Sequence, residues 1–251
     1  MGSEDSIRTE GYRQAMSTNL ICVIGPGRAG STIAARLRER GGRVVLAREP
    51  GPGDVVLLAV PDRAIAEVAA SVEPGPWVGH LSGATTLEAL APHGERRFAL
   101  HPLMTFRGDA DPGQLDGAFA AIGGASPAAV GLARELSALL GVTPFELADR
   151  DRARYHAAAC IAGNFLSTIY ATATRLDRSI GIGQAKQALY PLMRATLENA
   201  HADANGFALT GPIARGDEET VAAHLAALAD DPETAALYRV LARATTALAR
   251  A

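Results

Sequence analysis

Residues Leu20–Leu37 read LICVIGPGRAGSTIAARL, an apolar run followed by a glycine-rich turn and a segment of helical character. A strand, a Gly-x-Gly-x-x-Gly turn and a helix in this order form the fingerprint of a dinucleotide-binding unit. Gly25 permits the tight bend, Gly27 lets the backbone approach a pyrophosphate, and Gly30 lets strand and helix pack closely. We therefore expect the helix amides and dipole to face an anion, with cofactor contacts from Gly25, Pro26, Gly27, Arg28, Ala29 and Gly30. An ordinary glycine turn is the alternative.

The composition argues against several classes of partner. Of the 251 residues, 48% are apolar and 20% are charged, and the net charge is -3. A nucleic-acid surface would need concentrated positive charge, and no run approaches the ~20 apolar residues that cross a bilayer. We expect a globular, cytoplasmic protein with neither nucleic acid nor membrane as a partner.

Two further features bear on the compartment and the chain ends. The two cysteines, Cys22 and Cys160, lie on apolar stretches far apart in sequence, and we expect them to be buried thiols in a reducing compartment. Residues 1–18 are polar and aperiodic, so we predict a flexible N-terminal extension.

Short apolar runs alternate with helical patterns over the first half of the chain, which is typical of a parallel sheet with helices on its faces. We predict an α/β Rossmann domain over residues 19–148, with a doubly wound, mostly parallel sheet. The predicted strands are 20–24, 43–47, 55–60, 77–81, 98–100 and 118–122, and the predicted helices are 31–40, 62–71, 86–90 and 127–140.

The sheet is shortened between its second and third strands. Only a few residues around Glu49–Gly53 separate them, whereas a crossover between parallel strands usually needs about a dozen residues and a helix. We expect this connection to run extended around the sheet edge, or the second strand to pair in a different order.

Strand signals end near residue 148, and alanine-rich helical patterns follow over 155–177, 184–199, 218–229 and 232–250. We predict an all-α domain over residues 149–251. In two-domain reductases such a domain covers the nicotinamide and often dimerises, so we expect a substrate and dimerisation domain and a homodimer.

Polar side chains gather where predicted strands end, and in open parallel sheets the ligand lies beyond those ends. Val60 and Pro61 follow the third strand, Ser82 the fourth and His101 the fifth. Pro102 restricts His101 to an extended conformation, and a histidine that titrates near neutrality can supply a proton to a carbonyl oxygen that receives a hydride. A histidine that bonds a neighbouring loop is the alternative.

The helical half contributes two further candidates. His156, Cys160 and Asn164 recur every four residues on one predicted helix face; such a face is ordinarily core, yet the amide of Asn164 suits a carboxamide or a substrate oxygen. Arg215 could clamp a carboxylate through its planar fork, and its alternative is a solvated surface arginine. Asp217 is placed to cap the helix that follows.

Cofactor choice in such folds is set after the second strand, where an acid binds the ribose and an arginine accommodates a 2′-phosphate. Arg48 followed by Glu49 favours NADP, with Arg28 as a further phosphate contact, and leaves NAD open. The histidines form no close pair with carboxylates or cysteines at ligand spacing, so no metal site is expected.

The chain resembles a known family of Rossmann-like oxidoreductases whose C-terminal half is called domain of unknown function 2520. The resemblance rests on Val60-Pro61-Asp62, His80-Leu81-Ser82-Gly83, His101-Pro102-Leu103-Met104-Thr105-Phe106, Tyr155-His156-Ala157-Ala158, Asn164-Phe165 and Thr210-Gly211-Pro212-Ile213-Ala214-Arg215-Gly216-Asp217. It implies a Rossmann domain, a helical domain like that of 6-phosphogluconate dehydrogenase relatives, and commonly a dimer. Relatives include an alternative ketopantoate reductase. The shortened connection departs from the family pattern. β-Hydroxyacid dehydrogenases, by contrast, have a lysine at the place of Cys160, so their mechanism is not carried over.

Three hypotheses follow. The first is an NAD(P)H-dependent oxidoreductase that reduces a small, ketopantoate-like carbonyl acid, with the nicotinamide near Ser82, His101 as proton donor, Asn164 on the substrate and Arg215 on its carboxylate. The second is a catalytically silent NAD(P)-binding sensor or partner-binding protein, and the shortened connection motivates it. The third is an imine reductase resembling pyrroline-carboxylate reductase.

Overall fold

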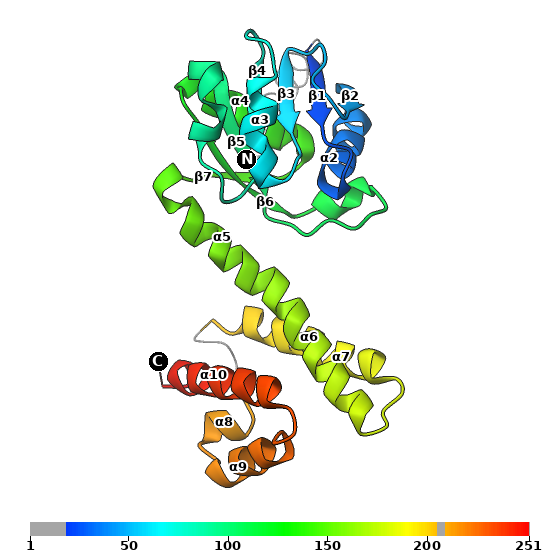
Figure 1. The fold of residues 1–251 in the computed structure, drawn as a ribbon, viewed down its shortest axis with the longest axis vertical. Helices are drawn as coiled ribbons and strands as arrows, with labels where there is room; N and C mark the ends of the chain where they lie inside the picture. Colours follow the sequence, from blue (N-terminus) through cyan, green and yellow to red (C-terminus); the bar gives the residue numbers. More distant parts are fainter. Residues whose placement is uncertain (1–18, 205–208, 251) are drawn as a thin grey trace. The chain divides into compact units, whose positions relative to one another are not determined.

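The computed structural model describes residues 19–204 and 209–250, and the chain divides into two compact units between Gly163 and Asn164 (Figure 1). The predicted extension, residues 1–18, lies outside the described residues. This division falls within a helical stretch. The predicted domain boundary at residues 148–149 stays a prediction. Each unit is described by itself.

The first unit is built on one seven-stranded sheet in the order β2-β1-β3-β4-β5-β6-β7. All neighbouring strands are parallel except β5 and β6, which are antiparallel. This confirms the predicted Rossmann-like, mostly parallel α/β class. The strands are β1 (Leu20–Ile24), β2 (Arg43–Ala47), β3 (Val55–Leu58), β4 (Trp77–His80), β5 (Arg97–Pro102), β6 (Phe119–Gly124) and β7 (Thr143–Glu146).

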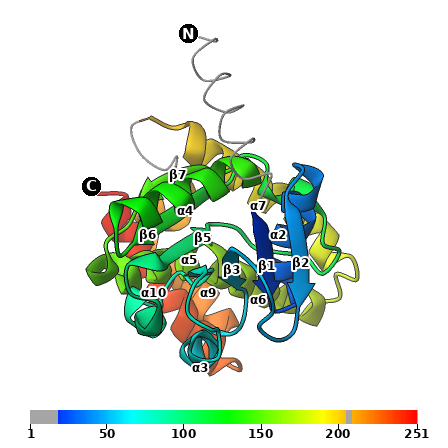
Figure 2. The ribbon, with the colours of Figure 1, turned by 90° about the horizontal axis from the view of Figure 1, so that it is seen from above.

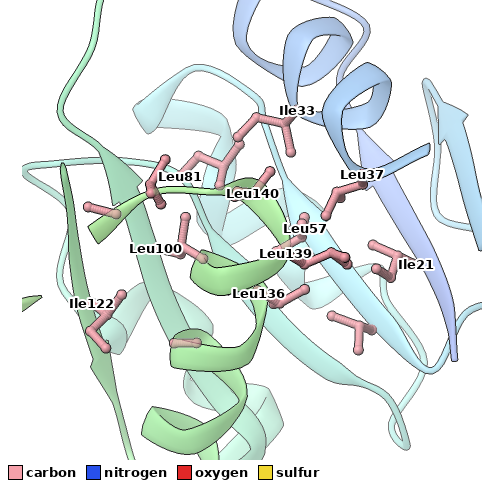
Figure 3. Packing of buried hydrophobic residues seen from close by; sticks show 14 of the residues in the cluster. Ile21, Ile33, Leu37, Leu57, Leu81, Leu100, Ile122, Leu136, Leu139 and Leu140 are labelled. Carbon is pink, nitrogen blue, oxygen red and sulfur yellow. The ribbon is translucent and has the colours of Figure 1, made fainter. Parts of the chain in front are cut away.

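Helices cover both faces of this sheet, as Figure 2 shows for α4 (Pro127–Leu140) and α3 (Ile65–Ala70). One buried cluster joins α2 (Arg28–Glu39) and α4 to the sheet through residues such as Leu37 and Leu136 (Figure 3). On the other face, α3 and the 3₁₀ segment η2 (Leu87–Arg96) pack on the apolar side chains of β1, β3 and β4. The two apolar layers bury the central strands, which explains their continuous hydrophobic runs.

The connection from β2 to β3 crosses the face of the sheet, which corrects the expected course around its edge. The backbone of Gly51 is hydrogen-bonded to the buried Cys22 thiol, and a Cβ atom on Gly53 would lie 3.1 Å from that of Cys22. β2 pairs with β1 alone, and β3 takes the other side of β1. The loop therefore covers β1 where a crossover helix would otherwise pack.

Local differences from the expected elements have physical causes. The last strand, β7, was not expected, because a four-residue strand that contains Pro144 carries little pattern. The predicted helix over 62–71 is a 3₁₀ turn, η1 (Asp62–Ala64), followed by α3. The predicted helix over 86–90 is the longer 3₁₀ segment η2, which contains Pro92.

The second unit is helical. A run of α5 (Arg152–Cys160), the π-helical η5 (Ile161–Phe165) and α6 (Leu166–Ser179) spans the division, and α7 (Ala185–Ala202), α8 (Pro212–Arg215), α9 (Glu218–Ala227) and α10 (Pro232–Leu248) follow. Asp231 links α6 to α10, because its carboxylate accepts hydrogen bonds from Arg175 at 2.6 Å and from the Thr234 amide at 3.0 Å. Among the helices of residues 19–204 and 209–250, none combines the length and apolar character of a membrane span.

Candidate functional site

The turn between β1 and α2 requires glycine at two positions. Gly25 has a φ of +107°, and a Cβ atom there would lie 2.4 Å from the carbonyl oxygen of Ala59. A Cβ atom on Gly30 would lie 2.0 Å from the Gly25 carbonyl oxygen. Both distances are shorter than any van der Waals contact, so these glycines let the turn and α2 pack against the end of β3, as predicted.

Gly27 differs from its neighbours because a Cβ atom there would meet nothing within 4 Å. It is exposed and precedes α2, whose first turn has neither a capping side chain nor an acidic residue. The first amides of a helix lack intrahelical acceptors, so Gly27, Arg28, Ala29 and Gly30 present N–H groups at the positive end of the helix dipole. Open space before uncapped amides fits a phosphate-bearing cofactor.

Arg48 lies beside this turn. The Gly25 amide donates to the carbonyl of Ala47, the last residue of β2, at 2.9 Å, and Arg48 follows directly with an exposed side chain. Glu49 is also exposed. The guanidinium therefore belongs to the same sheet end as the glycine turn, and the choice between NADP and NAD stays a prediction.

Val60, Pro61 and Ser82 follow β3 and β4 as expected, but the Ser82 hydroxyl has a local structural role. Its oxygen accepts hydrogen bonds from the amides of Ala84 and Thr85, and it donates to the Thr85 hydroxyl at 2.9 Å. Ser82 thus shapes the turn after β4. Its contact with a nicotinamide stays a prediction.

His101 is the centre of a ring cluster in the first unit. Its Nδ1 atom lies 2.7 Å from the hydroxyl oxygen of Tyr155, and its ring also meets His156 edge-on with centroids 6.1 Å apart. A Cβ atom on Gly83 would lie 3.0 Å from Nε2 of His101 and 2.7 Å from Cδ2 of His156. Gly83, in the turn after β4, therefore makes room for both imidazoles.

The electrostatics of this cluster favour a neutral imidazole. Burial, then the charges of His156 and Arg152, lower the pKa of His101 from 6.5 to about 4, against an opposing effect of Asp62. Burial raises the pKa of Tyr155 to about 12, although Arg152 opposes this. This corrects the expectation of a histidine that titrates near neutrality: at pH 7 the pair holds a neutral imidazole and a protonated phenol.

Beneath His101 lies a charged group that sequence reasoning missed. Arg152, the first residue of α5, is fully buried, and its Nε donates to Asp149 at 2.7 Å. His80, at the end of β4, is also fully buried, and burial followed by the Arg152 charge lowers its pKa to about 4. Among the described residues, neither Nη atom of Arg152 has a hydrogen-bond partner, whereas a hydrogen bond with the Thr86 backbone raises the pKa of His80 against the effect of burial.

The available signal for Arg152 was its position three residues before Tyr155, since residues at this spacing share a helix face. Sequence alone could not show that this face is buried. His156 and Cys160 do lie together as predicted, with Nδ1 and Sγ 3.9 Å apart. Cys22 is buried as expected, whereas Cys160 is partly exposed.

The remaining predicted residues belong to the second unit. Asn164 lies in η5 with an exposed side chain; π-helical turns are rare and often occur at functional sites. Arg215 ends α8 and is exposed. Asp217 caps α9 as predicted, because its Oδ1 accepts from the Thr220 amide at 3.0 Å. The roles of Asn164 and Arg215 in a site stay predictions.

Comparisons with known proteins place this architecture. Residues 118–245 match the family described as "Domain of unknown function (DUF2520)". A Bacteroides fragilis protein, provisionally described as an NADP oxidoreductase, is similar with a TM-score of 0.81 and 21% identity over 92% of this chain and 99% of that one.

Two further solved structures share the fold. For a Thermotoga maritima protein the TM-score is 0.74, with 21% identity over 92% of this chain and 98% of that one. For the 1-pyrroline-5-carboxylate reductase of Streptococcus pyogenes the TM-score is 0.62, with 15% identity over 93% of this chain and 98% of that one. Comparison of the sequence with curated proteins gives no match.

Proposed function

The chain belongs to the DUF2520 family, and we propose that this member is an NAD(P)H-dependent oxidoreductase that reduces a small carbonyl acid. The main observation behind this proposal is that the glycine turn before α2 and the His101–Tyr155 pair both lie at carboxyl ends of strands in one sheet. In such sheets a cofactor crosses those ends. The fold shared with oxidoreductases supports the proposal.

The glycine turn would hold the cofactor phosphates. Open space at Gly27 and the amides of Arg28 and Ala29 receive the pyrophosphate, and the exposed guanidinium of Arg48 receives a 2′-phosphate, which makes NADP the proposed cofactor. When bound, the nicotinamide supplies the hydride that reduces the carbonyl carbon. The turn after β4, at Ser82 and Gly83, lies next to His101 and would receive the redox end.

His101 would direct the proton that the carbonyl oxygen receives. With Tyr155 protonated and His101 neutral, the phenol donates to Nδ1, and the Nε2–H group is left to donate to the substrate oxygen. An alkoxide is more basic than a tyrosinate, so a proton passed from Tyr155 through His101 to the new hydroxyl moves downhill. A neutral imidazole thereby serves as the donor without becoming an imidazolium.

The helical unit would complete the enzyme. We propose that Asn164 and Arg215 contact the substrate, as expected for an amide and a guanidinium that face a polar ligand. Large apolar side chains exposed on this unit, among them Ile180 and Leu192, support a homodimer, because monomers rarely expose so much apolar surface.

The experiment that tests this function measures cofactor binding and turnover separately. NADPH and NADH are titrated by the fluorescence of the reduced nicotinamide, because Trp77 lies at the amino end of β4, away from Ser82. Oxidation of NADPH is then followed over a panel of 2-oxo acids, with cyclic imines as a second class. Turnover with oxo acids supports the proposal. Turnover with imines alone makes it an imine reductase, and saturable binding without turnover makes it a sensor.

A further inference from the structure

A buried polar cluster lies on the sheet face below His101. His80 is opposite Ala99 in the parallel β4–β5 pair, and His101 is opposite Ala121 in the antiparallel β5–β6 pair. Ala99 also pairs with Gly123. Opposed residues and alternate residues share a face, so His80, His101 and Gly123 belong to one surface, where Ala99 and Ala121 lie between them.

Arg152 lies over this surface with its terminal nitrogens unused. Its Nη2 atom would be 3.1 Å from a Cβ atom on Gly123, so the glycine makes room for the guanidinium. Asp149 does not bond the Nη atoms: its Oδ1 accepts from Nε of Arg152, and its Oδ2 accepts from the Leu87 amide at 2.9 Å. Nη1 and Nη2 are both buried without a partner.

Buried donors without acceptors are rare in folded proteins, and each calls for an acceptor. The two Nη groups of a guanidinium lie in one plane at the spacing of two carboxylate oxygens, and they bind this group bidentately. Because Nε is anchored by Asp149, the fork is oriented before a ligand arrives, and less conformational freedom is lost on binding.

The cofactor phosphates are not the occupant of this site. Arg152 contacts β6, which is separated from β1 by β3, β4 and β5. With neighbouring strands ~4.8 Å apart, the guanidinium lies roughly 19 Å across the sheet from the glycine turn. It belongs instead to the sheet face that carries His101, whose pKa its charge lowers.

We propose that Arg152, assisted by His80, forms a buried subsite that binds the carboxylate of the substrate beside His101. This inference rests on the proposed function and deepens it, because it assigns the acid group of the carbonyl acid to the first unit. Arg152 lies at Gly123, which pairs with Ala99 of β5. Ala99 and His101 are two residues apart on that strand, a separation of ~7 Å. One small molecule can therefore bring its carbonyl to His101 and its adjacent carboxylate to Arg152.

The test compares Arg152→Lys, which keeps the charge but loses the fork, with Arg150→Lys as a matched control. Arg150 lies two residues away and its side chain is 85% exposed. The thermal shift caused by pyruvate is compared with that caused by neutral pyruvamide, with and without NADPH. We expect the wild type and Arg150→Lys to prefer pyruvate at least tenfold in apparent affinity, and Arg152→Lys to lose that preference. His80→Leu, which removes both ring nitrogens, should reduce it.

Several results would overturn the inference. They are an absence of carboxylate preference in the wild type, an unchanged preference in Arg152→Lys and His80→Leu, or a loss confined to Arg215→Lys. Any of them would mean that internal water alone satisfies the buried nitrogens. Because the shift without NADPH involves no turnover, an inactive protein that still prefers pyruvate through Arg152 refutes the proposed reaction and not the subsite.

Discussion

The Nδ1 atom of His101 and the hydroxyl oxygen of Tyr155 lie 2.7 Å apart, within hydrogen-bond distance, although 54 residues separate them in sequence. The histidine comes from β5 and the tyrosine from α5. The contact fixes which nitrogen of the ring is free: with Nδ1 occupied by the phenol, Nε2 faces Gly83. A substrate bound beyond β4 would therefore meet a donor whose orientation is set by the fold.

Removing the phenol tests this pair. Tyr155→Phe keeps the ring packing but takes away the group that donates to Nδ1 of His101, so we expect kcat to fall about a hundredfold with little change in the affinity for NADPH. Tyr238→Phe, which removes the hydroxyl that lies 2.8 Å from Nδ1 of His224 in the second unit, is the matched control. Steady-state kinetics with the best substrate of the panel measures the effect. Equal kcat values for the two variants would remove Tyr155 from the proton path.

The pH dependence of turnover follows from the neutral state of His101. Its folded-state pKa is about 4, so the neutral imidazole persists from pH 8 down to pH 5. We expect kcat/KM to hold a plateau over this range and to decline only as the pH approaches 4, where the ring gains a proton. A profile measured with a stopped assay, which avoids the acid lability of NADPH, checks this. An acid limb near pH 6.5 would contradict the neutral imidazole.

His80 should make stability depend on pH. Its pKa is about 4 in the folded protein and 6.5 when unperturbed. Between these values the unfolded chain binds more protons, so the free energy of unfolding rises with pH, and this contribution is lost as the pH falls from 6.5 towards 4. The shift corresponds to about 2 kcal/mol between pH 7 and pH 4.5. The charges that face the ring are Arg152, which lowers the pKa, and Asp149 and Asp62, which raise it.

Urea denaturation at pH 7 and at pH 4.5 measures this contribution. The free energy of unfolding should differ less between the two pH values in His80→Leu than in the wild type, by about 2 kcal/mol. His201→Leu, at an exposed histidine, should leave this difference unchanged. The same pH dependence in both variants would mean that His80 titrates normally.

The glycine turn offers a separation of folding from binding. A Cβ atom on Gly27 meets nothing, so Gly27→Ala should fold with wild-type stability yet obstruct the pyrophosphate and weaken NADPH binding at least about tenfold, or about 1.4 kcal/mol. Gly108→Ala, equally free of contacts, is the control for the substitution itself. Gly25→Ala should destabilise the whole unit, because its φ is +107° and Ala59 blocks the Cβ. Thermal melts and NADPH titrations of the three variants separate these effects.

These residues show which parts of the molecule local sequence can predict. The turn at Gly25–Gly30 and the capping Asp217 were predicted because each depends on neighbours within a few positions. The course of the chain over Cys22 was not, because the path of a short loop depends on what the sheet leaves uncovered. β7 carried too few residues to form a pattern.

The site was predicted in part for the same reason. His101 was found because a strand ends there, but its partner Tyr155 and the buried Arg152 come from α5, and only tertiary packing brings them to β5. The Ser82 hydroxyl, expected to face the cofactor, is held by the amides of its own turn. Short polar side chains after strands often satisfy such local bonds first.

The last prediction tests the proposed homodimer. On α7, Tyr190 and Leu197 are seven residues apart and so lie on one helix face, and they are 59% and 52% exposed. If this face packs against a second copy, a charge there costs the desolvation of a carboxylate in an apolar interface. Leu197→Asp should therefore convert the dimer to a monomer at micromolar concentration in sedimentation velocity. Val45→Asp makes the same change at an exposed apolar residue of β2 and should remain dimeric. A wild type that sediments as a monomer, or a Leu197→Asp variant that stays dimeric, would show that this face is not the interface.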